Sequence, residues 1–529
     1  MNDIYLERKI YSQAIEKRIR SLKDGYRQNI AVIGDELVGK TTIIFDILKK
    51  FNDPHIIIIY LEVRPETLGI FCRRFIAILL YNFLANSCIP LKEDIDFLLG
   101  KSEKYIPETT KKIRSILSAL QKRKKSNVFS ELLSLGESIN QETGKFCVII
   151  FDEFHNFQDI GVKNLYGEWA KLLILQKNTM YILISSLKFK ARQILSKDLA
   201  LLFGNFEILT VEPLTTRESE HYIELKAGDT EIGGGLKNFI VHFTSGYPFY
   251  LKTITEALLK SDTGNLTEAI ENIVFDHSGI LNQRFSNYIK RFFDSGRSRD
   301  YISILYLISS GHNKLKEIAH IMRHPKKELD TRINYLLEID AITKSGDFLK
   351  INDRVFGFWI KFVYQEKLNS LTFDAKNQKD QFRNHIEGIL EEFLRSAQKP
   401  IIERVEELLR SFDDDMMQLE RKKLRLTHFR EIKPLEFGKG NLKLGLIGRS
   451  TDSLWIIGFK NDTVTEEDVA EFADECKKFR HKLQKKIIIT LSDIDANAKL
   501  RALEEKIWIW DTNSLNEIMD LFSKPRVIV

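Results

Sequence analysis

The sequence predicts a multidomain protein that begins with an α/β domain built on a parallel sheet and ends with a second α/β domain. Its 529 residues suggest about three or four domains, at roughly 100–200 residues per domain. Short β-branched runs alternate with helical stretches over the first part of the chain, and strand and helix alternate again near its end. Hydrophobic residues make up 43% and charged residues 29% of the chain, which is typical of a soluble globular protein.

The first domain is predicted to span residues 1–215. Apolar runs bounded by turn residues are typical of strands in a parallel sheet that is covered on both faces. A long helical insertion, about residues 66–140, separates the second run from the third. The five runs are residues 29–34, 55–63, 146–153, 180–186 and 205–214.

The first run is followed by "GDELVGKT", which fits the phosphate-loop pattern G-x-x-x-x-G-K-[ST]. Glycines let backbone N–H groups curl around phosphate oxygens, the lysine brings a positive charge, and the Thr hydroxyl is a ligand for Mg²⁺. The helix that follows directs its positive end at the anion. The alternative is an ordinary glycine turn, and two loop carboxylates, Asp35 and Glu36, should weaken nucleotide binding. The predicted nucleotide contacts are Gly34, Val38, Gly39, Lys40, Thr41 and Thr42.

Acidic residues end the third run, "CVIIFDEF". A carboxylate at the tip of a buried strand is costly unless it has a function. Asp152 is predicted to join Thr41 in holding Mg²⁺, and Glu153 to polarise the attacking water. The fourth run ends in two serines, of which Ser186 is the first candidate for a phosphate or water sensor and Ser185 the second. Ordinary solvated strand ends are the alternative.

The middle of the chain is predicted to be helical over residues 216–295, followed by a winged-helix domain at 296–368 and a linker at 369–381. Three short helices and a hairpin around Ser345-Gly346-Asp347 predict the winged helix, whose third helix can enter a DNA groove. Acidic neighbours dilute its basic residues, so the alternative is a docking module within the protein. The candidate DNA contacts are Arg323, Lys326, Lys327, Arg332 and Lys344, with Lys350 also in the hairpin.

Most of residues 1–365 resembles the archaeal ATPases of the STAND class, relatives of origin-recognition-type AAA+ proteins. The resemblance rests on the order of "GDELVGKTT", "IIFDEFHNF", "ILISSLKFKARQIL", "TVEPLTTRESEHYI", "TSGYPFYLKTI" and "NDRVFGFWIKFVY". It implies a switch in which ADP keeps a helical lid and the winged helix folded onto the ATPase, ATP exchange opens or assembles the protein, and hydrolysis is slow.

The same resemblance places a lid Gly-x-Pro near the nucleotide, which here corresponds to Gly246 and Pro248. On residues alone, this is a turn before a helix. The chain departs from the family at two points. The family often has two arginines where this loop has Asp35 and Glu36. It also tends to have Gly-Arg before the fifth strand, where this chain has "FGN", so an arginine role is missing or moved to Arg192.

Residues 382–529 resemble the restriction-endonuclease-like domain that often follows such ATPases; an unrelated α/β domain is the alternative. These nucleases hold Mg²⁺ with an Asp on one strand and Glu-x-Lys on the next. The second strand here reads Gly458-Phe-Lys460, and the first has no acid, with Asp452 only in the turn. We therefore predict that the domain is catalytically inactive.

The sequence as a whole predicts a cytoplasmic ATPase that uses ATP or ADP and Mg²⁺, with no membrane partner. Four scattered cysteines and an N-terminus without a signal-peptide pattern favour the cytoplasm. The net charge of +6 neither requires nor excludes nucleic acid. Double-stranded DNA, a protein partner and a second copy of the chain are all open as partners. Two rival functions remain: a DNA-binding initiator or regulator with ATP-controlled affinity, and an ATP-dependent nuclease.

Overall fold

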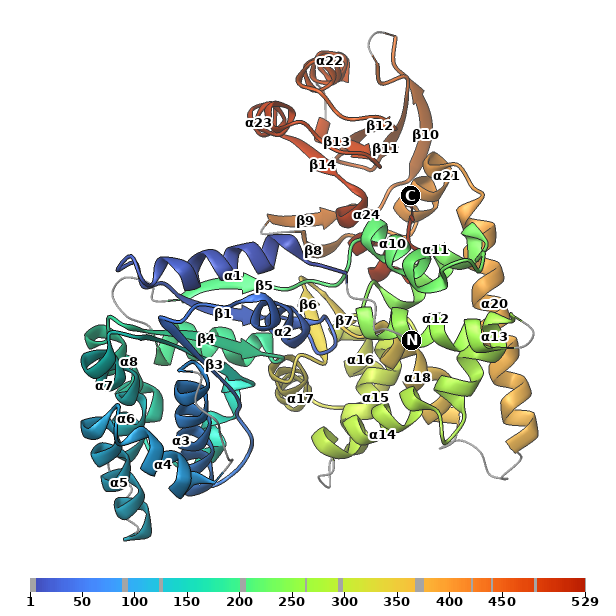
Figure 1. The fold of residues 1–529 in the computed structure, drawn as a ribbon. Coiled ribbons are helices and arrows are strands. Elements are labelled where there is room, and N and C mark those ends of the chain that lie inside the picture. The colour runs from blue at the N-terminus through green and yellow to red at the C-terminus, as the bar shows by residue number, and fades with distance from the viewer. Residues whose placement is uncertain are drawn as a thin grey trace. The chain divides into compact units, whose positions relative to one another are not determined.

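A computed structural model of the chain contains two compact units (Figure 1). The first is Met1–Pro213 with Glu338–Asp340, and the second is Leu214–Leu337 with Ala341–Val529. The division after Pro213 falls close to the predicted end of the first domain. The structure describes residues 6–87, 94–122, 127–199, 206–261, 264–293, 298–366, 375–419, 422–438, 441–479 and 483–528.

A five-stranded sheet forms the centre of the first unit, in the order β2-β3-β4-β1-β5. Every neighbouring pair is parallel, which confirms the predicted parallel sheet. The strands coincide with the apolar runs because β-branched side chains suit a buried pleated surface. Their bounds are β1 Asn29–Ile33, β2 Ile56–Glu62, β3 Phe146–Asp152, β4 Thr179–Ser185 and β5 Phe206–Thr210.

The register of this sheet brings the predicted site residues to one edge. Ile33, the last residue of β1, lies opposite Ser185 of β4. Asp152, the last residue of β3, lies opposite Glu62 of β2. Parallel strands end at the same edge of a sheet, which is where ligands bind in open α/β folds. The loop after β1 and the acids after β3 therefore lie on the same side of the unit.

Helices cover the first unit's sheet and fill its insertion. The predicted insertion at 66–140 is helical, and its apolar side chains join the core beneath the sheet. The helices are α1 Lys9–Ser21, α2 Lys40–Lys50, α3 Leu68–Ala85, α4 Ile95–Ser102, α5 Pro107–Gln121, α6 Val128–Leu133, α7 Leu135–Thr143, η1 Phe154–Ile160, α8 Leu165–Leu175, α9 Lys188–Gln193 and η2 Ile194–Asp198.

Helix α3 is long and apolar enough, by length and composition, to cross a membrane. Half of that stretch is buried inside the unit, where Phe71 and Phe75 contact Phe151 of the central sheet. Packing in this core accounts for its apolar composition, so α3 by itself is weak evidence for a membrane span. The absence of a membrane partner stays a prediction.

Cysteines in the described part of the chain are buried and free. Burial raises the pKa of the thiols of Cys72, Cys147 and Cys476 to about 12, which keeps them protonated and unreactive at neutral pH. The fourth cysteine, Cys88, lies outside the described residues. The cytoplasmic location stays a prediction.

The second unit begins with a helical segment and continues with three helices and a hairpin at the predicted positions. The hairpin strands pair antiparallel, with Ser345 opposite Phe348. The first segment contains α10 Thr216–Ala227, α11 Gly234–Thr244, α12 Pro248–Lys260, α13 Leu266–Ile270, η3 Glu271–Phe275 and α14 Ile280–Phe293. The next contains α15 Ser298–Ser309, α16 Leu315–Met322, α17 Lys326–Glu338, β6 Ile342–Ser345 and β7 Phe348–Ile351.

Helix α20, Ala375–Ala397, corrects two predictions. Its first turns occupy residues 375–381 of the predicted linker; residues 369–374 lie outside the described part. The helix also packs on the helical segment rather than opening the C-terminal domain. Its Lys379 binds the buried Glu271 carboxylate at 2.7 Å, and its Phe393 ring meets Phe239 of α11. Before it come α18 Arg354–Trp359 and η4 Ile360–Tyr364.

The C-terminal domain contains a five-stranded mixed sheet in the order β10-β11-β12-β13-β14. Its last three strands are parallel neighbours and its first three are antiparallel. The alternation of strand and helix predicted near the end of the chain is present here. The strands are β10 Glu431–Glu436, β11 Leu444–Arg449, β12 Leu454–Lys460, β13 Leu483–Thr490 and β14 Ile507–Trp510, and a separate hairpin is β8 Asp415–Leu419 with β9 Lys422–Leu426. The helices are α21 Ile401–Leu409, α22 Glu466–Cys476, α23 Ala496–Glu504 and α24 Thr512–Leu521.

The tip of the β6–β7 hairpin is bonded to β8 of the C-terminal domain. Ser345 donates its hydroxyl to the Gln418 carbonyl at 2.9 Å, and the Asp347 amide donates to the Met416 carbonyl at 2.8 Å. Between them, a Cβ on Gly346 would lie 2.1 Å from the Met416 carbonyl oxygen, so only glycine fits. The hairpin therefore connects the three-helix segment to the C-terminal domain through hydrogen bonds within the unit.

Candidate nucleotide site

The loop between β1 and α2 has the backbone that close approach to an anion requires. Gly34 has no room for a side chain, since a Cβ would lie 2.4 Å from the Val211 carbonyl oxygen. Gly39 has a φ of +91° and precedes the first residue of α2, a conformation that favours glycine. The loop thus leads directly into a helix N-terminus, where backbone N–H groups lack intrahelical partners. The Val38 side chain is buried and Thr42 is exposed, so any contact of Val38 with a nucleotide would come from its backbone.

Lys40 folds its side chain back over this loop. Its Nζ donates to the carbonyl oxygens of Gly34 at 2.9 Å and Asp35 at 2.7 Å, and the residue is only 6% exposed. Burial lowers the pKa of Lys40, and the nearby carboxylates, Glu153 and Asp152 foremost, oppose that shift. A buried ammonium held by carbonyl oxygens is placed to exchange them for phosphate oxygens.

Thr41 and Asp152 are brought together from two different elements. The Thr41 hydroxyl, at the start of α2, donates to Oδ2 of Asp152, at the end of β3, at 2.9 Å. Tyr60 of β2 donates its hydroxyl to the same oxygen at 2.6 Å, and the Asp152 residue is 4% exposed. A hydroxyl and a carboxylate in contact are the oxygen ligands that Mg²⁺ prefers, so these residues fit the predicted metal.

Glu153 lies beside this pair and is held by Ser186. Its Oε2 accepts from both the backbone N–H and the hydroxyl of Ser186, each at 2.9 Å. Burial raises the pKa of Glu153, the Ser186 amide opposes the shift, and the Asp152 charge adds to it. Glu153 also has a φ of +52°, a strained backbone for a non-glycine residue that is common at functional sites. Its carboxylate therefore has the environment of a general base.

The two serines after β4 have different surroundings. Ser186 contacts the Glu153 carboxylate, whereas Ser185 is fully buried and its hydroxyl lies 2.8 Å from Nδ1 of His155. The same His155 nitrogen is 3.3 Å from Oε2 of Glu153. Ser185 is thus linked to Glu153 only through His155, and Ser186 is the serine that contacts the Glu153 carboxylate directly.

Asp35 does not simply oppose an anion as the sequence suggested. Its carboxylate accepts from Lys188, the first residue of α9, at 2.8 Å, and both side chains are largely buried. The pair cancels much of the repulsion between Asp35 and an incoming phosphate, and it fixes the loop to the segment after β4. This pair could not be predicted from the sequence, because the two residues are separated by most of the domain.

Three residues of this site were missed from the sequence: Tyr60, His155 and Lys188. Tyr60 carried a usable signal, since it lies near the carboxyl end of an apolar strand, two residues before the one opposite Asp152. His155 also carried one, as a histidine two residues beyond the predicted base. Lys188 depends on a contact distant in sequence.

Gly246 and Pro248 lie in the second unit, where both have structural roles. Gly246 has a φ of +77°, and a Cβ there would lie 2.1 Å from the Leu214 carbonyl oxygen. Pro248 is the first residue of α12, a position that suits proline. Their predicted contact with nucleotide stays a prediction, as does a role for the exposed Arg192 of α9.

The predicted DNA-contact residues divide into bound and exposed groups. Arg332 is 2.8 Å from the Asp300 carboxylate, and its side chain is only 11% exposed. Lys350 binds the buried Asp520 at 2.5 Å. Both are committed to ion pairs inside the unit. Arg323, Lys327 and Lys344 are exposed, and the side chain of Lys326 lies outside the described residues.

The nuclease-like positions of the C-terminal domain form no metal site. A Cβ on Gly458 would lie 2.7 Å from a Leu442 methyl and 3.0 Å from the Phe472 ring, so the packed core fills the space a glutamate would need. Lys460 is paired with the fully buried Asp468 at 3.1 Å. Within the described residues, no group of three or more His, Cys, Asp or Glu side chains could hold a metal ion.

Restoring the glutamate therefore gives a stability prediction. Gly458→Glu should destabilise the protein by at least about 2 kcal/mol, since it overpacks the core and buries a carboxylate without a partner. Gly388→Glu is the matched control, because Gly388 is helical with nothing within 4 Å of its added Cβ. Thermal unfolding should show a lower midpoint for the first variant alone. A Gly458→Glu protein with wild-type stability and Mg²⁺-dependent DNA cleavage would contradict the assignment of an inactive domain.

Comparison with known proteins gives only distant likenesses. No family model and no curated protein sequence matches the chain. Among solved structures, a Walker-type ATPase of Pyrococcus abyssi is 18% identical with a TM-score of 0.48, covering 68% of this chain and 97% of that one. The Aeropyrum pernix ORC2 protein, in ADPNP–ADP complexes, is 12% identical with a TM-score of 0.41, covering 70% and 98%. The Aeropyrum pernix ORC1 protein in complex with DNA is 10% identical with a TM-score of 0.35, covering 67% and 92%. Likeness at this level carries no argument about activity, so the function must be argued from the site.

Proposed function

We propose that this protein is a P-loop ATPase that binds ATP with Mg²⁺ at the loop after β1, hydrolyses it slowly and acts as a nucleotide-controlled switch. The single observation that carries the proposal is the 2.9 Å contact between Thr41 Oγ1 and Asp152 Oδ2. It joins the predicted phosphate loop to the predicted acid across β4, which separates their two strands in the sheet. A glycine turn that binds no ligand would not require Thr41 and Asp152 to be in contact.

Lys40 would bind the outer phosphates, because its ammonium already lies over the loop on two carbonyl oxygens. The backbone N–H groups at the start of α2 would bind the same anion. Thr41 and Asp152 would hold Mg²⁺, which when bound neutralises charge on the phosphate oxygens. Tyr60 would keep the Asp152 carboxylate oriented through its 2.6 Å hydrogen bond.

Glu153 would take the proton of the attacking water. All three of its described side-chain contacts, to the Ser186 amide, the Ser186 hydroxyl and His155, use Oε2. That arrangement leaves Oε1 to face a water. Ser186 would act as a positioning residue that links the end of β4 to the base, and its two hydrogen bonds also restrain the carboxylate in this conformation.

The switch part of the proposal rests on the second unit. We assign its helical segment as a lid, the segment predicted at 296–368 as a winged helix, and the residues after α20 as a nuclease-like domain without activity. The bonds from the hairpin tip to β8 support a docking role for the winged helix. A protein partner or a second copy of the chain would then be the target of the switch, in the cytoplasm.

Asp152→Asn tests the proposed site with little change in shape. In this variant, we expect half-maximal ATP turnover to require about 10–100-fold more Mg²⁺ than in the wild type, the usual effect of losing a residue that orients a metal. Asp24→Asn, at an exposed position on the same unit, is the matched control and should behave as wild type. Turnover by Asp152→Asn at the wild-type Mg²⁺ dependence would show that Asp152 has no part in holding the metal.

Contact with double-stranded DNA is a separate proposal. Two of the predicted basic residues of this segment are engaged in ion pairs, which leaves Arg323, Lys327 and Lys344 as exposed candidates. If they bind DNA, charge reversal at Lys326 and Lys327 should abolish a salt-dependent affinity for duplex. Affinity that is absent in the wild type, or unchanged by the reversal, would leave docking as the role of this segment.

A further inference from the structure

A cavity inside the second unit has the features of a ligand site. Its volume is about 310 Å³, which is at the lower end of the range for small-molecule pockets. Its walls come from α11, α15, the hairpin strand β7, α18 with η4, α20, and the end of α24 with the segment that follows it. All of these elements belong to the one unit, so the cavity does not depend on the phosphate-loop domain.

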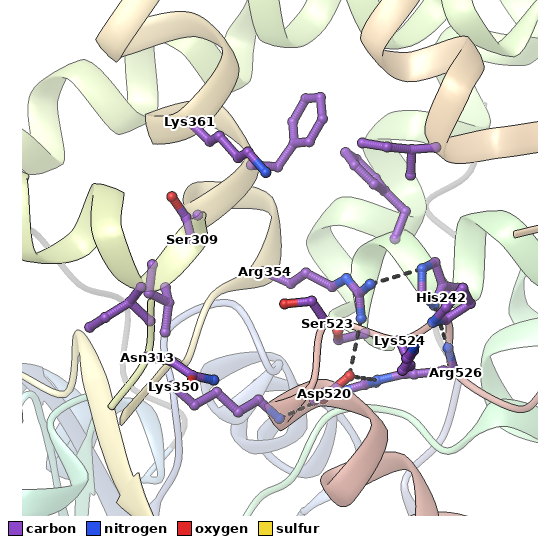
Figure 2. A pocket seen from close by; sticks show the side chains of 18 of the residues that line it. His242, Ser309, Asn313, Lys350, Arg354, Lys361, Asp520, Ser523, Lys524 and Arg526 are labelled. Carbon is purple, nitrogen blue, oxygen red and sulfur yellow. Dashed lines mark hydrogen bonds and ion pairs between the residues drawn. The ribbon is translucent and has the colours of Figure 1, made fainter. Parts of the chain in front are cut away.

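One buried carboxylate at the base of this cavity is shared by three cations. Asp520, with a side chain 5% exposed, accepts from Lys350 at 2.5 Å, Arg354 at 3.2 Å and Arg526 at 2.6 Å. Figure 2 shows these three side chains meeting at Asp520, with Lys361 elsewhere on the wall. A single carboxylate cannot neutralise three positive charges, so the cluster retains a positive excess.

Two further lysines increase that excess. Lys361 and Lys524 line the cavity, are partly buried, and form no ion pair with any described residue. The second carboxylate on the wall, Glu392, is exposed, and it interacts with Lys361 electrostatically without forming an ion pair. Of the described lining residues, five are cationic and two are anionic. Partly buried cations without an ion-pair partner are unfavourable unless something else compensates their charge.

His242, on α11, faces two N–H donors, one at each of its ring nitrogens. Its Nε2 lies 2.8 Å from Nη2 of Arg354, and its Nδ1 lies 3.2 Å from the backbone N of Arg526. Burial, with Arg354 and Arg526 next, lowers the pKa of His242 well below its ordinary value, so the ring is neutral. A neutral imidazole accepts at only one nitrogen. One of the two N–H donors therefore needs another acceptor.

The rest of the wall is apolar and partly aromatic. Phe243, Phe358 and Phe362 line the cavity together with Ile389. Phe362 lies beside the Lys361 ammonium, 4.9 Å from its ring centroid. A pocket that combines convergent cations with aromatic faces suits a ligand that has a compact anion and a ring or short carbon skeleton. A simple inorganic ion would leave this apolar side unused.

We propose that this cavity is a second ligand site that binds the phosphate monoester of a small organic molecule. A phosphate monoester carries close to two negative charges at neutral pH and several strong acceptor oxygens. It would offset most of the excess charge and accept from Lys361, Lys524 and the unsatisfied donor beside His242. Because its walls belong to the helical segment, the hairpin, α20 and the C-terminal segment, a bound ligand would hold these parts together.

The test is calorimetric titration in the Lys40→Ala background, so that nucleotide binding at the phosphate loop does not contribute. The probes are AMP, glucose 6-phosphate, inorganic phosphate and uncharged adenosine. We expect one site per chain for AMP, glucose 6-phosphate or both, and binding of the organic phosphates at least about tenfold tighter than of inorganic phosphate or adenosine, because each charged hydrogen bond and buried apolar group contributes. Binding of AMP alone would identify a nucleotide site, and binding of both a broader phosphate-ester site.

Lys361→Gln combined with Lys524→Gln provides the matched variant. Neither lysine has an ion-pair partner among the described residues, so the double variant should fold and keep the thermal midpoint of its parent, yet bind about tenfold weaker or worse. Lys316→Gln, at an exposed lysine of the same unit, should not affect binding. The proposal is wrong if neither organic phosphate binds, if inorganic phosphate or adenosine binds equally well, or if the double variant binds like its parent.

Discussion

Glu153→Gln is expected to leave ATP binding intact and to lower the rate of ATP hydrolysis by about 10²–10⁴-fold, the usual contribution of a general base. The amide keeps the size of the side chain and one oxygen for the Ser186 hydrogen bonds, but it cannot take a proton. Equilibrium binding of labelled ATP and steady-state phosphate release, measured on the same preparation, separate the two effects.

The pH dependence of turnover provides a further check on Glu153. The base works only when ionised, and burial raises the pKa of its carboxyl. Turnover should therefore fall as the pH drops through a value above the ordinary range for glutamate, and this acidic limb should be missing in Glu153→Gln. Glu131→Gln, at an exposed position of the same unit, is the control and should keep the acidic limb. A Glu153→Gln protein that hydrolyses ATP normally would show that another group is the base.

Lys40→Ala is expected to weaken ATP binding by roughly a hundredfold or more, because removing one partner of a buried charge pair costs about 2–5 kcal/mol. The ammonium is buried on the carbonyl oxygens of Gly34 and Asp35, and no water can replace its charge. Calorimetric titration with a non-hydrolysable ATP analogue and Mg²⁺ measures the loss directly.

Lys50→Ala is the matched control for this experiment. Lys50 ends the same helix, but it is exposed and paired with Asp46 and Glu7, so its loss should not change ATP affinity. Thermal unfolding of both variants separates lost binding from lost folding. ATP affinity in Lys40→Ala equal to wild type, in a folded protein, would exclude the loop as the nucleotide site.

The parallel sheet and its loop could be predicted from the sequence because their signals are local. The strands other than β5 are nearly continuous apolar runs, and the residues that follow β1 and β3 are close in sequence to the strands that position them. The adjacency of Thr41 and Asp152 followed from the rule that parallel strands end at one edge. The same rule placed Ser186, although it could not decide between Ser186 and Ser185.

The features that could not be predicted from the sequence depend on tertiary contacts. β10 was missed because it carries Pro434 and has only one buried residue, Ile432, a composition that edge strands tolerate. The linker prediction failed at residues 375–381 because a polar stretch became helical when α20 packed on the buried Glu271. The Asp35–Lys188 pair and the hairpin hydrogen bond at Met416 link residues too distant in sequence for any periodicity to reveal.

The most direct test of the central claim is to purify the wild-type and Lys40→Ala proteins, extract the nucleotide that accompanies each, and identify it by chromatography. A nucleotide-controlled switch at this site predicts tightly held ADP in the wild type and none in Lys40→Ala. A wild-type site that is empty while ATP turns over steadily, or equal amounts of nucleotide in the two proteins, would contradict it.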